Sequence, residues 1–178
     1  MGGIIYEFCI QPMNAVYLEA IAMYVIWLMG MFLLRGRAKR IIAGIVLVFS
    51  VILILYATIL NRQSTGHELS LIPFISFENA KIQPELYRAM FMNLILFMPL
   101  GMSMPFVLPE KVRMKVLLTI GTGLLLSVAV EAVQYVFRLG KCETDDVIVN
   151  TAGAVIGSSV YLIICLFRFV IRRNKQRS

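Results

Sequence analysis

The stretch IIAGIVLVFSVILILYATIL, residues 41–60, contains no charged side chain. An α-helix rises about 1.5 Å per residue, so about 20 residues cross the roughly 30 Å hydrocarbon layer of a bilayer. In lipid, only helices and closed barrels satisfy every backbone hydrogen bond, and this solid apolar run lacks the alternation of a barrel strand. The stretch therefore predicts a membrane-spanning helix.

Four further stretches have the same character and carry at most one charge each. With 60% hydrophobic residues and a mean hydropathy of +0.84, the chain leaves too few polar residues for a separate soluble domain. We expect an all-α polytopic membrane protein, a small bundle of five transmembrane helices forming a single domain over residues 1–178. Besides 41–60, the predicted helices are 13–34, 89–108, 116–137 and 147–167, with a long outer loop at 61–88.

The net charge of +7 is distributed unevenly along this layout. Basic residues concentrate in the connections 35–40 and 111–115 and in the segment 168–177, which share one side of a five-helix bundle. Because positive residues mark the cytoplasmic side, we expect the N-terminus outside and the C-terminus in the cytoplasm. We expect the two basic connections to set the topology and little else, and the basic C-terminal tail to contact anionic membrane lipids and not nucleic acid.

Metal and cofactor sites have little basis in the sequence. The single histidine, His67, and three cysteines without metal-ligand spacing give no metal site, and we expect no cofactor. Cys9 and Cys142 both fall on the outer side of the predicted layout, so whether they form a disulfide stays open.

Polar residues that are unfavourable in lipid lie near the outer ends of the predicted helices. A charged side chain within a membrane helix normally faces protein or a water-filled cavity. Glu131, Gln134 and Arg138 fall on one helical stripe, and Asp146 and Asn150 fall on another. At similar depth the neighbouring helices contribute further polar groups, so we predict a ligand-binding site made by Arg62, Arg88, Asn93, Glu131, Gln134, Arg138, Asp145, Asp146 and Asn150.

Several of these positions can have a structural role instead. Asp145 and Asp146 are suitable helix N-cap residues, so they either cap the last helix or bind something. Gly153 and Gly157 form a GxxxG pair that allows a neighbouring helix to approach closely. Proline and glycine within helix 89–108 predict a kink, and an apolar motif in the outer loop predicts contact with the bundle or the interface. The residues concerned are Pro99, Gly101, Pro73 and Phe74.

Four motifs, taken in order, resemble the VanZ family of bacterial membrane proteins. They are LIPF (71–74), NLILFMPLG (93–101), SVAVEAVQYVFRLG (127–140) and TDDVIVNTAGAVIG (144–157), so the resemblance runs from about residue 61 to 157. It implies a multi-pass protein of the bacterial plasma membrane with a role in low-level resistance to glycopeptide antibiotics such as teicoplanin. The positions carried over from the family are Asn93, Pro99, Gly101, Glu131, Gln134, Arg138, Asp145, Asp146, Asn150 and Gly153.

Three functions are compatible with these observations. The first is a non-enzymatic protein whose outward-facing polar cavity binds an amphiphile, either a lipoglycopeptide or a lipid-linked cell-wall precursor. The second is a membrane enzyme in which Asp145 and Asp146 hold a divalent cation and Glu131 acts as general base. The third is a transporter or flippase for a lipid-linked envelope substrate, although the inner half of the predicted bundle has almost no polar side chains beyond hydroxyls.

Overall fold

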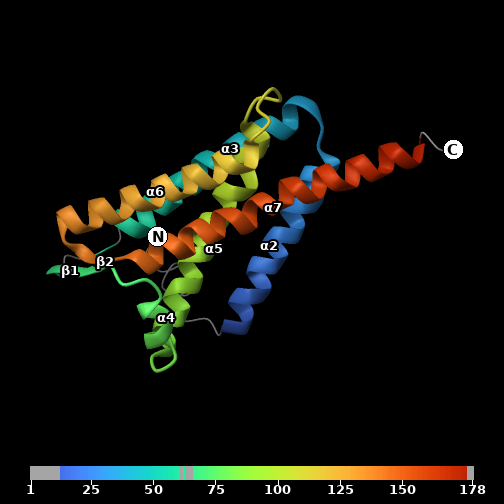
Figure 1. Ribbon diagram of the computed structural model, residues 1–178. Helices are drawn as coiled ribbons and strands as arrows, with labels where there is room; N and C mark the ends of the chain where they lie inside the picture. The colour runs from blue at the N-terminus through green and yellow to red at the C-terminus, as the bar shows by residue number, and fades with distance from the viewer. Residues whose placement is uncertain (1–12, 61, 63–65, 176–178) are drawn as a thin grey trace.

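The computed structural model describes residues 13–60, 62 and 66–175, and in this part of the chain five helices are long and apolar enough to cross a membrane. The predicted all-α membrane fold is therefore confirmed (Figure 1). The helices are α2 (Met13–Leu33), α3 (Gly36–Leu55), α5 (Pro84–Val107), α6 (Lys115–Phe137) and α7 (Thr144–Lys175), and α3 continues into the π-helical turn η1 (Tyr56–Leu60).

Three short elements lie in segments that we predicted to be loops. Strand β1 (Gly66–Ser70) pairs in parallel with β2 (Leu139–Glu143), and the short helix α4 (Ile75–Ala80) follows β1. Residues 61–88 and 139–145 are therefore not simple connections. Their pairing joins residues about seventy positions apart (Gly66 lies opposite Leu139), and no local pattern in either segment announces such a contact.

The helix boundaries differ from those predicted because hydropathy marks only the part of a helix that lies at hydrocarbon depth. Helix α5 begins at Pro84, five positions before the predicted start, and proline favours the first turn of a helix. Helix α7 covers residues 144–175 where 147–167 was predicted. Its first turn contains acidic residues, which suit a helix N-terminus, and its last turns contain the basic residues from Arg168 onward.

Helices α5 and α7 form the central pair, and α2, α3 and α6 pack around them. The two backbones approach so closely that a Cβ atom at Gly153 would overlap the Leu94 carbonyl oxygen, and one at Gly157 would overlap that of Met98. Gly101 on α5 faces the Ala154 backbone in the same way. Close approach of this kind strengthens van der Waals packing, which drives helix association in lipid.

Two apolar clusters surround this central pair. One joins α3, α5, α6 and α7 through the buried side chains of Ile54, Phe97, Val130 and Ala154. The other joins α2, α5 and α7 around Met31 and Met102, and there the Trp27 indole N–H donates to the Met102 carbonyl oxygen at 3.0 Å. Pro99 lies inside α5, which continues past it as one helix.

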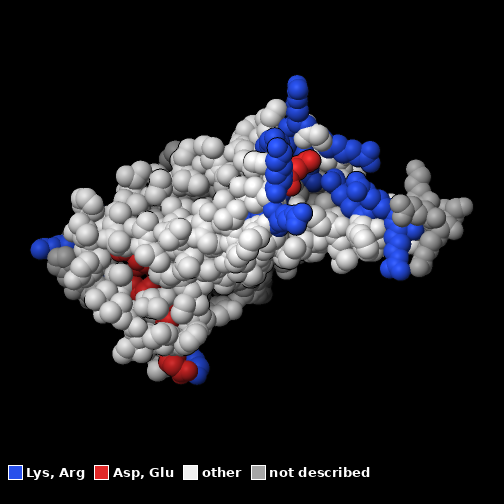
Figure 2. Space-filling view, turned by 45° about the horizontal axis from the view of Figure 1, so that its top comes forward, with Lys and Arg blue, Asp and Glu red and all other residues white. Residues whose placement is uncertain are grey.

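The charged side chains divide the molecule into two ends (Figure 2). The basic end contains the α2–α3 and α5–α6 connections and the C-terminal turns of α7. The opposite end, named the strand end here, contains β1, β2 and α4, and most of the acidic residues lie there. This separation places the predicted polar site at the strand end.

Candidate functional site

A cavity of about 400 Å³ opens at the strand end between the N-terminal half of α5, strand β2 and the start of α7. Its polar lining contains three cations and three carboxylates, so it is close to neutral overall. Leu86, Met90 and Met92 supply apolar wall. The polar residues that line it are Arg62, Ser76, Glu85, Arg88, Asn93, Lys141, Glu143 and Asp146.

Asp146 is the carboxylate from α7 that lines this cavity. The Asn93 side chain hydrogen-bonds to it from α5, and the positive charge of Arg62 acts on it. Arg62 in turn lies against Gly140 of β2, where a Cβ atom would come within 3.0 Å of the guanidinium Nη1. Gly140 has a φ of +115°, a conformation that glycine alone adopts readily, so this residue both permits the turn and leaves room for Arg62.

Asp145, the neighbouring acid, has a different environment and is only 1% exposed. Its Oδ1 accepts the Phe74 backbone N–H at 2.5 Å, and its Oδ2 accepts the Ser76 backbone N–H at 2.7 Å. Phe74 has a φ of 66° and precedes the first residue of α4. The carboxylate of Asp145 therefore binds the start of α4 and attaches this helix to α7.

A second polar link joins the same elements. The Ser76 hydroxyl donates to Glu143 Oε2 at 2.6 Å, and the Lys141 ammonium forms an ion pair with Glu143 Oε1 at 2.7 Å. Glu143 therefore connects α4 with β2 while it lines the cavity.

Glu131 lies beneath the cavity lining and is 5% exposed. Its Oε2 accepts the Glu143 backbone N–H at 3.0 Å, and the Cys142 thiol hydrogen-bonds to it. Burial and the nearby Glu131 carboxylate raise the pKa of the Cys142 thiol to about 11. The carboxylate thus holds β2 against α6, and the positive charge of Arg62 acts on it from the cavity side.

Two buried amides form a deeper layer. The Gln134 Nε2 donates to the Thr58 carbonyl oxygen at 2.9 Å, and Thr58 belongs to the π-helical turn η1. The Asn150 Nδ2 donates to the Ser127 hydroxyl at 2.8 Å, which links α7 to α6. Within the described part of the chain, Gln134 Oε1 and Asn150 Oδ1 are buried and accept no hydrogen bond.

The nine predicted site residues therefore separate into groups. Arg62, Arg88, Asn93 and Asp146 line the cavity. Asp145, Glu131, Gln134 and Asn150 lie outside its lining and join elements to one another. Arg138 is exposed and is the C-cap residue of α6, with a left-handed φ of 59°.

The prediction missed four residues that line the cavity: Ser76, Glu85, Lys141 and Glu143. Helical spacing could have identified Glu85, which lies three positions before Arg88 in the same helix. The other three reach the cavity only because β1 pairs with β2 and α4 folds onto α7.

The two aspartates do not act together at one position, because Asp146 lines the cavity whereas Asp145 does not. Both oxygens of Asp145 already accept backbone N–H groups. Across residues 13–60, 62 and 66–175, no three side chains of His, Cys, Asp or Glu lie close enough together to hold a metal ion. Cys9, whose pairing with Cys142 was left open, lies outside the described residues.

The helical bundle with this polar site at one end defines a multi-pass membrane protein, and the comparison of sequences gives its class. The model of the VanZ/LLP1 family matches residues 41–168, so the chain belongs to that family. This confirms the predicted resemblance and extends it beyond residues 61–157 in both directions.

Among individual proteins, the chain is similar to Protein VanZ of Enterococcus faecium. The two are 31% identical over 93 residues, which cover 52% of this chain and 52% of that protein. The chain thus matches about half the length of its curated relative. No solved structure matches the chain.

Proposed function

We propose that this protein is a non-enzymatic component of the bacterial plasma membrane that lowers susceptibility to lipoglycopeptides such as teicoplanin. In this proposal, it binds the polar head of an amphiphile in the strand-end cavity, which faces outward. Membership of the VanZ/LLP1 family supports the link to glycopeptide resistance. The observation that carries the binding role is the cavity itself, with Arg62, Arg88 and Asp146 on its wall.

The lining suits a head group that has both acceptors and donors. Guanidinium groups bind phosphate or carboxylate oxygens by charge-assisted hydrogen bonds, and Asp146 and Asn93 can bind amines or sugar hydroxyls. A cavity of about 400 Å³ is small for a ligand site, which commonly measures roughly 300–1,000 Å³. It therefore fits the head of a lipid-linked wall precursor, or one part of a glycopeptide, better than a whole glycopeptide.

The surroundings of the cavity suit a ligand that arrives from the membrane. Ser76, which lines the cavity, lies two positions after the LIPF motif in the chain. Leu71, Ile72 and Phe74 of this motif are 66%, 64% and 59% exposed. An exposed apolar segment beside a polar cavity provides contact for an acyl chain and for a head group at the same time.

The enzyme hypothesis has less support from the geometry. It needs Asp145 and Asp146 to hold a cation and Glu131 to act as base, yet of these three only Asp146 lines the cavity. The amphiphile-binding role uses the groups that do line the cavity.

Expression in a glycopeptide-susceptible strain tests the proposal. We expect the wild-type chain to raise the minimal inhibitory concentration of teicoplanin, and Arg62→Gln and Asp146→Asn each to abolish the increase. Membrane abundance must be matched by immunoblot. Unchanged susceptibility in the strain that expresses the wild-type chain, with the protein verified in the membrane, contradicts the resistance role.

The α4 variant Glu78→Gln and the neighbouring Lys81→Gln provide matched controls. These two residues form an exposed ion pair with each other at 2.7 Å at the same end of the molecule, and neither lines the cavity. Each control changes the charge by the same amount as a cavity variant, and both should retain full protection. If the cavity variants also retain it, the protein acts in resistance through another surface.

A further inference from the structure

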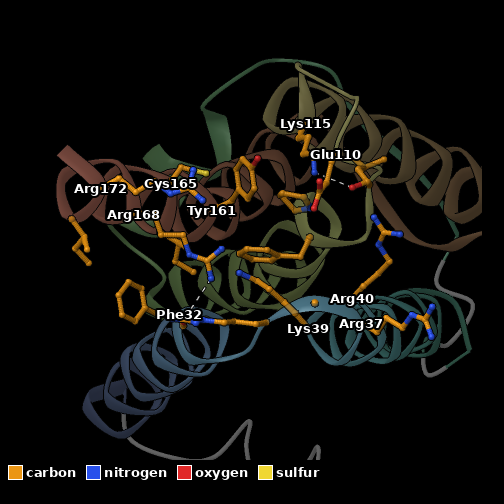
Figure 3. A pocket seen from close by; sticks show the side chains of 17 residues that line it. Phe32, Arg37, Lys39, Arg40, Glu110, Lys115, Tyr161, Cys165, Arg168 and Arg172 are labelled. Carbon is orange, nitrogen blue, oxygen red and sulfur yellow. Dashed lines mark hydrogen bonds between the residues drawn. The ribbon is translucent and has the colours of Figure 1, made fainter. Parts of the chain in front are cut away.

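The basic end contains a second and larger cavity, of about 910 Å³, which the proposed function does not use (Figure 3). It lies where the α2–α3 connection, the end of α5, the start of α6 and the C-terminal half of α7 meet. Seven basic residues line it, against the single acid Glu110. They are Arg35, Arg37, Lys39, Arg40, Lys115, Arg168 and Arg172.

Two of these cations, Lys115 and Lys39, are held in the wall of the cavity. Lys115 is only 8% exposed, and its Nζ donates to the Leu108 carbonyl oxygen at 2.9 Å. The Lys39 Nζ lies 4.3 Å from the centroid of the Phe106 ring, and the charges of Arg168 and Lys115 both act on Lys39. Basic residues that only set membrane topology need nothing more than an exposed connection, so this convergence requires a different explanation.

Few acidic side chains lie close enough to neutralise the cations of this cavity. Among the described residues, the ion pairs are Lys81–Glu78 and Lys141–Glu143, both at the strand end, and none involves a residue lining this cavity. The positive charges of Arg168 and Lys115 repel that of Lys39, and a bound anion with several oxygens offsets this repulsion. The arrangement is complementary to a phosphate group, which Arg and Lys bind by charge-assisted hydrogen bonds.

The rest of the lining is apolar. Phe32, Phe106, Tyr161, Ile164 and Ile171 form part of the wall. Outside it, exposed apolar side chains such as Leu33 (72% exposed) continue along the helices that face lipid. A ligand that is complementary to both the basic and the apolar residues of this cavity has a phosphate head group and acyl chains.

We propose that this basic cavity is a specific site for an anionic membrane lipid whose phosphate head group carries more than one negative charge. With seven cations against one acid, each further negative charge on the head group offsets more of the repulsion within the lining. The site lies at the opposite end of the molecule from the strand-end cavity, so it does not depend on the proposed function.

Binding of dispersed lipid to the purified protein in detergent tests this site. We expect phosphatidic acid, whose phosphate can carry two charges, to bind at least tenfold more tightly than phosphatidylcholine, which has no net charge, in native mass spectrometry. It should also bind several-fold more tightly than phosphatidylglycerol, which has a single charge. Inorganic pyrophosphate, which offers the phosphate chemistry without acyl chains, should bind at least tenfold more weakly than phosphatidic acid. Equal affinity for phosphatidylcholine overturns the anionic site, and equal affinity for phosphatidylglycerol overturns the need for more than one charge. Equal affinity for pyrophosphate overturns the assignment to a lipid.

Two triple variants separate a defined site from general attraction to the basic end. Arg35→Gln/Arg40→Gln/Arg172→Gln removes three exposed cations from the cavity lining and should weaken phosphatidic acid binding at least tenfold. Lys111→Gln/Arg113→Gln/Arg173→Gln removes three cations of the same end that do not line it, and should change binding less than twofold. Equal losses in both variants show that the attraction is diffuse and overturn the proposal.

Discussion

Asp145 and Asp146 are adjacent in the chain but serve different parts of the structure. The side chain of Asp145 accepts two backbone N–H groups at the start of α4, whereas that of Asp146 lines the strand-end cavity. From sequence alone, both were candidates for a helix cap and for a ligand contact. Their different roles follow from the position of α4, which no property of the pair itself determines.

Removing the Asp145 carboxylate should release helix α4 from α7. In Asp145→Ala the Phe74 and Ser76 N–H groups lose their acceptor. Leaving the buried Ser76 donor unsatisfied costs about 1–3 kcal/mol. We expect trypsin to cleave after the exposed Lys81 several-fold faster than in the wild type. Asp146→Ala, which removes no acceptor from α4, should leave the rate near that of the wild type. Equal rates in the wild type and Asp145→Ala contradict this anchoring role.

The Cys142 thiol should be unreactive near neutral pH. Its pKa is raised from 9.0 to about 11 by burial and by Glu131, and the thiolate is the nucleophile, so its population below pH 9 is about 100-fold lower than for an unperturbed thiol. In a Cys9→Ser/Cys165→Ser background, alkylation by N-ethylmaleimide at pH 8 should be slower by about that factor.

Glu131→Gln should accelerate this alkylation, because it removes the negative charge that disfavours the thiolate. The rate should also rise about tenfold per pH unit up to about pH 10, since the thiolate fraction grows in that proportion below the pKa. A rate like that of a free cysteine, or no response to Glu131→Gln, contradicts the contact between the two side chains.

At the level of the elements, the α5–α7 pair depends on small residues. Gly157 leaves no space for a Cβ atom beside the Met98 carbonyl oxygen, and Gly153 leaves none beside that of Leu94. Gly121, in contrast, lies within α6, and a Cβ atom added there would meet nothing within 4 Å. The glycines of the long helices are therefore not equivalent.

Gly157→Ala should destabilise the bundle by about 1–3 kcal/mol, since α5 and α7 must move apart to admit the methyl group. Unfolding in sodium dodecyl sulphate can be followed by the fluorescence of Trp27, the single tryptophan. Its indole N–H donates a hydrogen bond to the Met102 carbonyl oxygen of α5. Gly121→Ala is the matched control and should unfold within about 1 kcal/mol of the wild type, because alanine favours a helix over glycine. Equal destabilisation by the two substitutions contradicts the close packing.

The long helices could be predicted from sequence because charge-free runs such as 41–60 and 147–167 have few other solutions in lipid. The π-helical turn η1 could not be predicted, because its residues continue the same apolar run. Its Thr58 carbonyl oxygen gains a role only because the distant Gln134 side chain donates a hydrogen bond to it. Strands β1 and β2 were missed for a similar reason. Short segments such as LGKCE acquire a strand conformation only when a distant partner pairs with them.

The candidate site was predicted in part. Intramembrane polar residues such as Glu131 and Asn150 stand out in sequence because they are costly in lipid. The free-energy cost of placing them in lipid indicates that they have partners, but it does not identify those partners. The structure shows that Glu131 binds the backbone of β2. Cavity residues such as Ser76 and Lys141 lie in segments predicted to be outside the lipid, so no unfavourable transfer into lipid distinguishes them in the sequence.

The molecule as a whole has two chemically different ends, and this difference predicts its orientation. The basic end should face the cytoplasm and the strand end should face outward, following the positive-inside rule. A green fluorescent protein fused after Ser178 should fluoresce, and alkaline phosphatase at the same position should be inactive. The reverse pattern would place the strand-end cavity on the cytoplasmic side and contradict its proposed outward role.

Photo-crosslinking from within the strand-end cavity is the decisive experiment for the proposed function. A photoreactive amino acid replaces Met92, which lines the cavity, or Leu125, which is 71% exposed on α6 and does not line it. In resistant cells we expect position 92 to capture teicoplanin or a lipid-linked precursor, identified by mass spectrometry, and position 125 to capture only bulk lipid. If resistance is intact and both positions give the same products, the cavity does not bind the amphiphile.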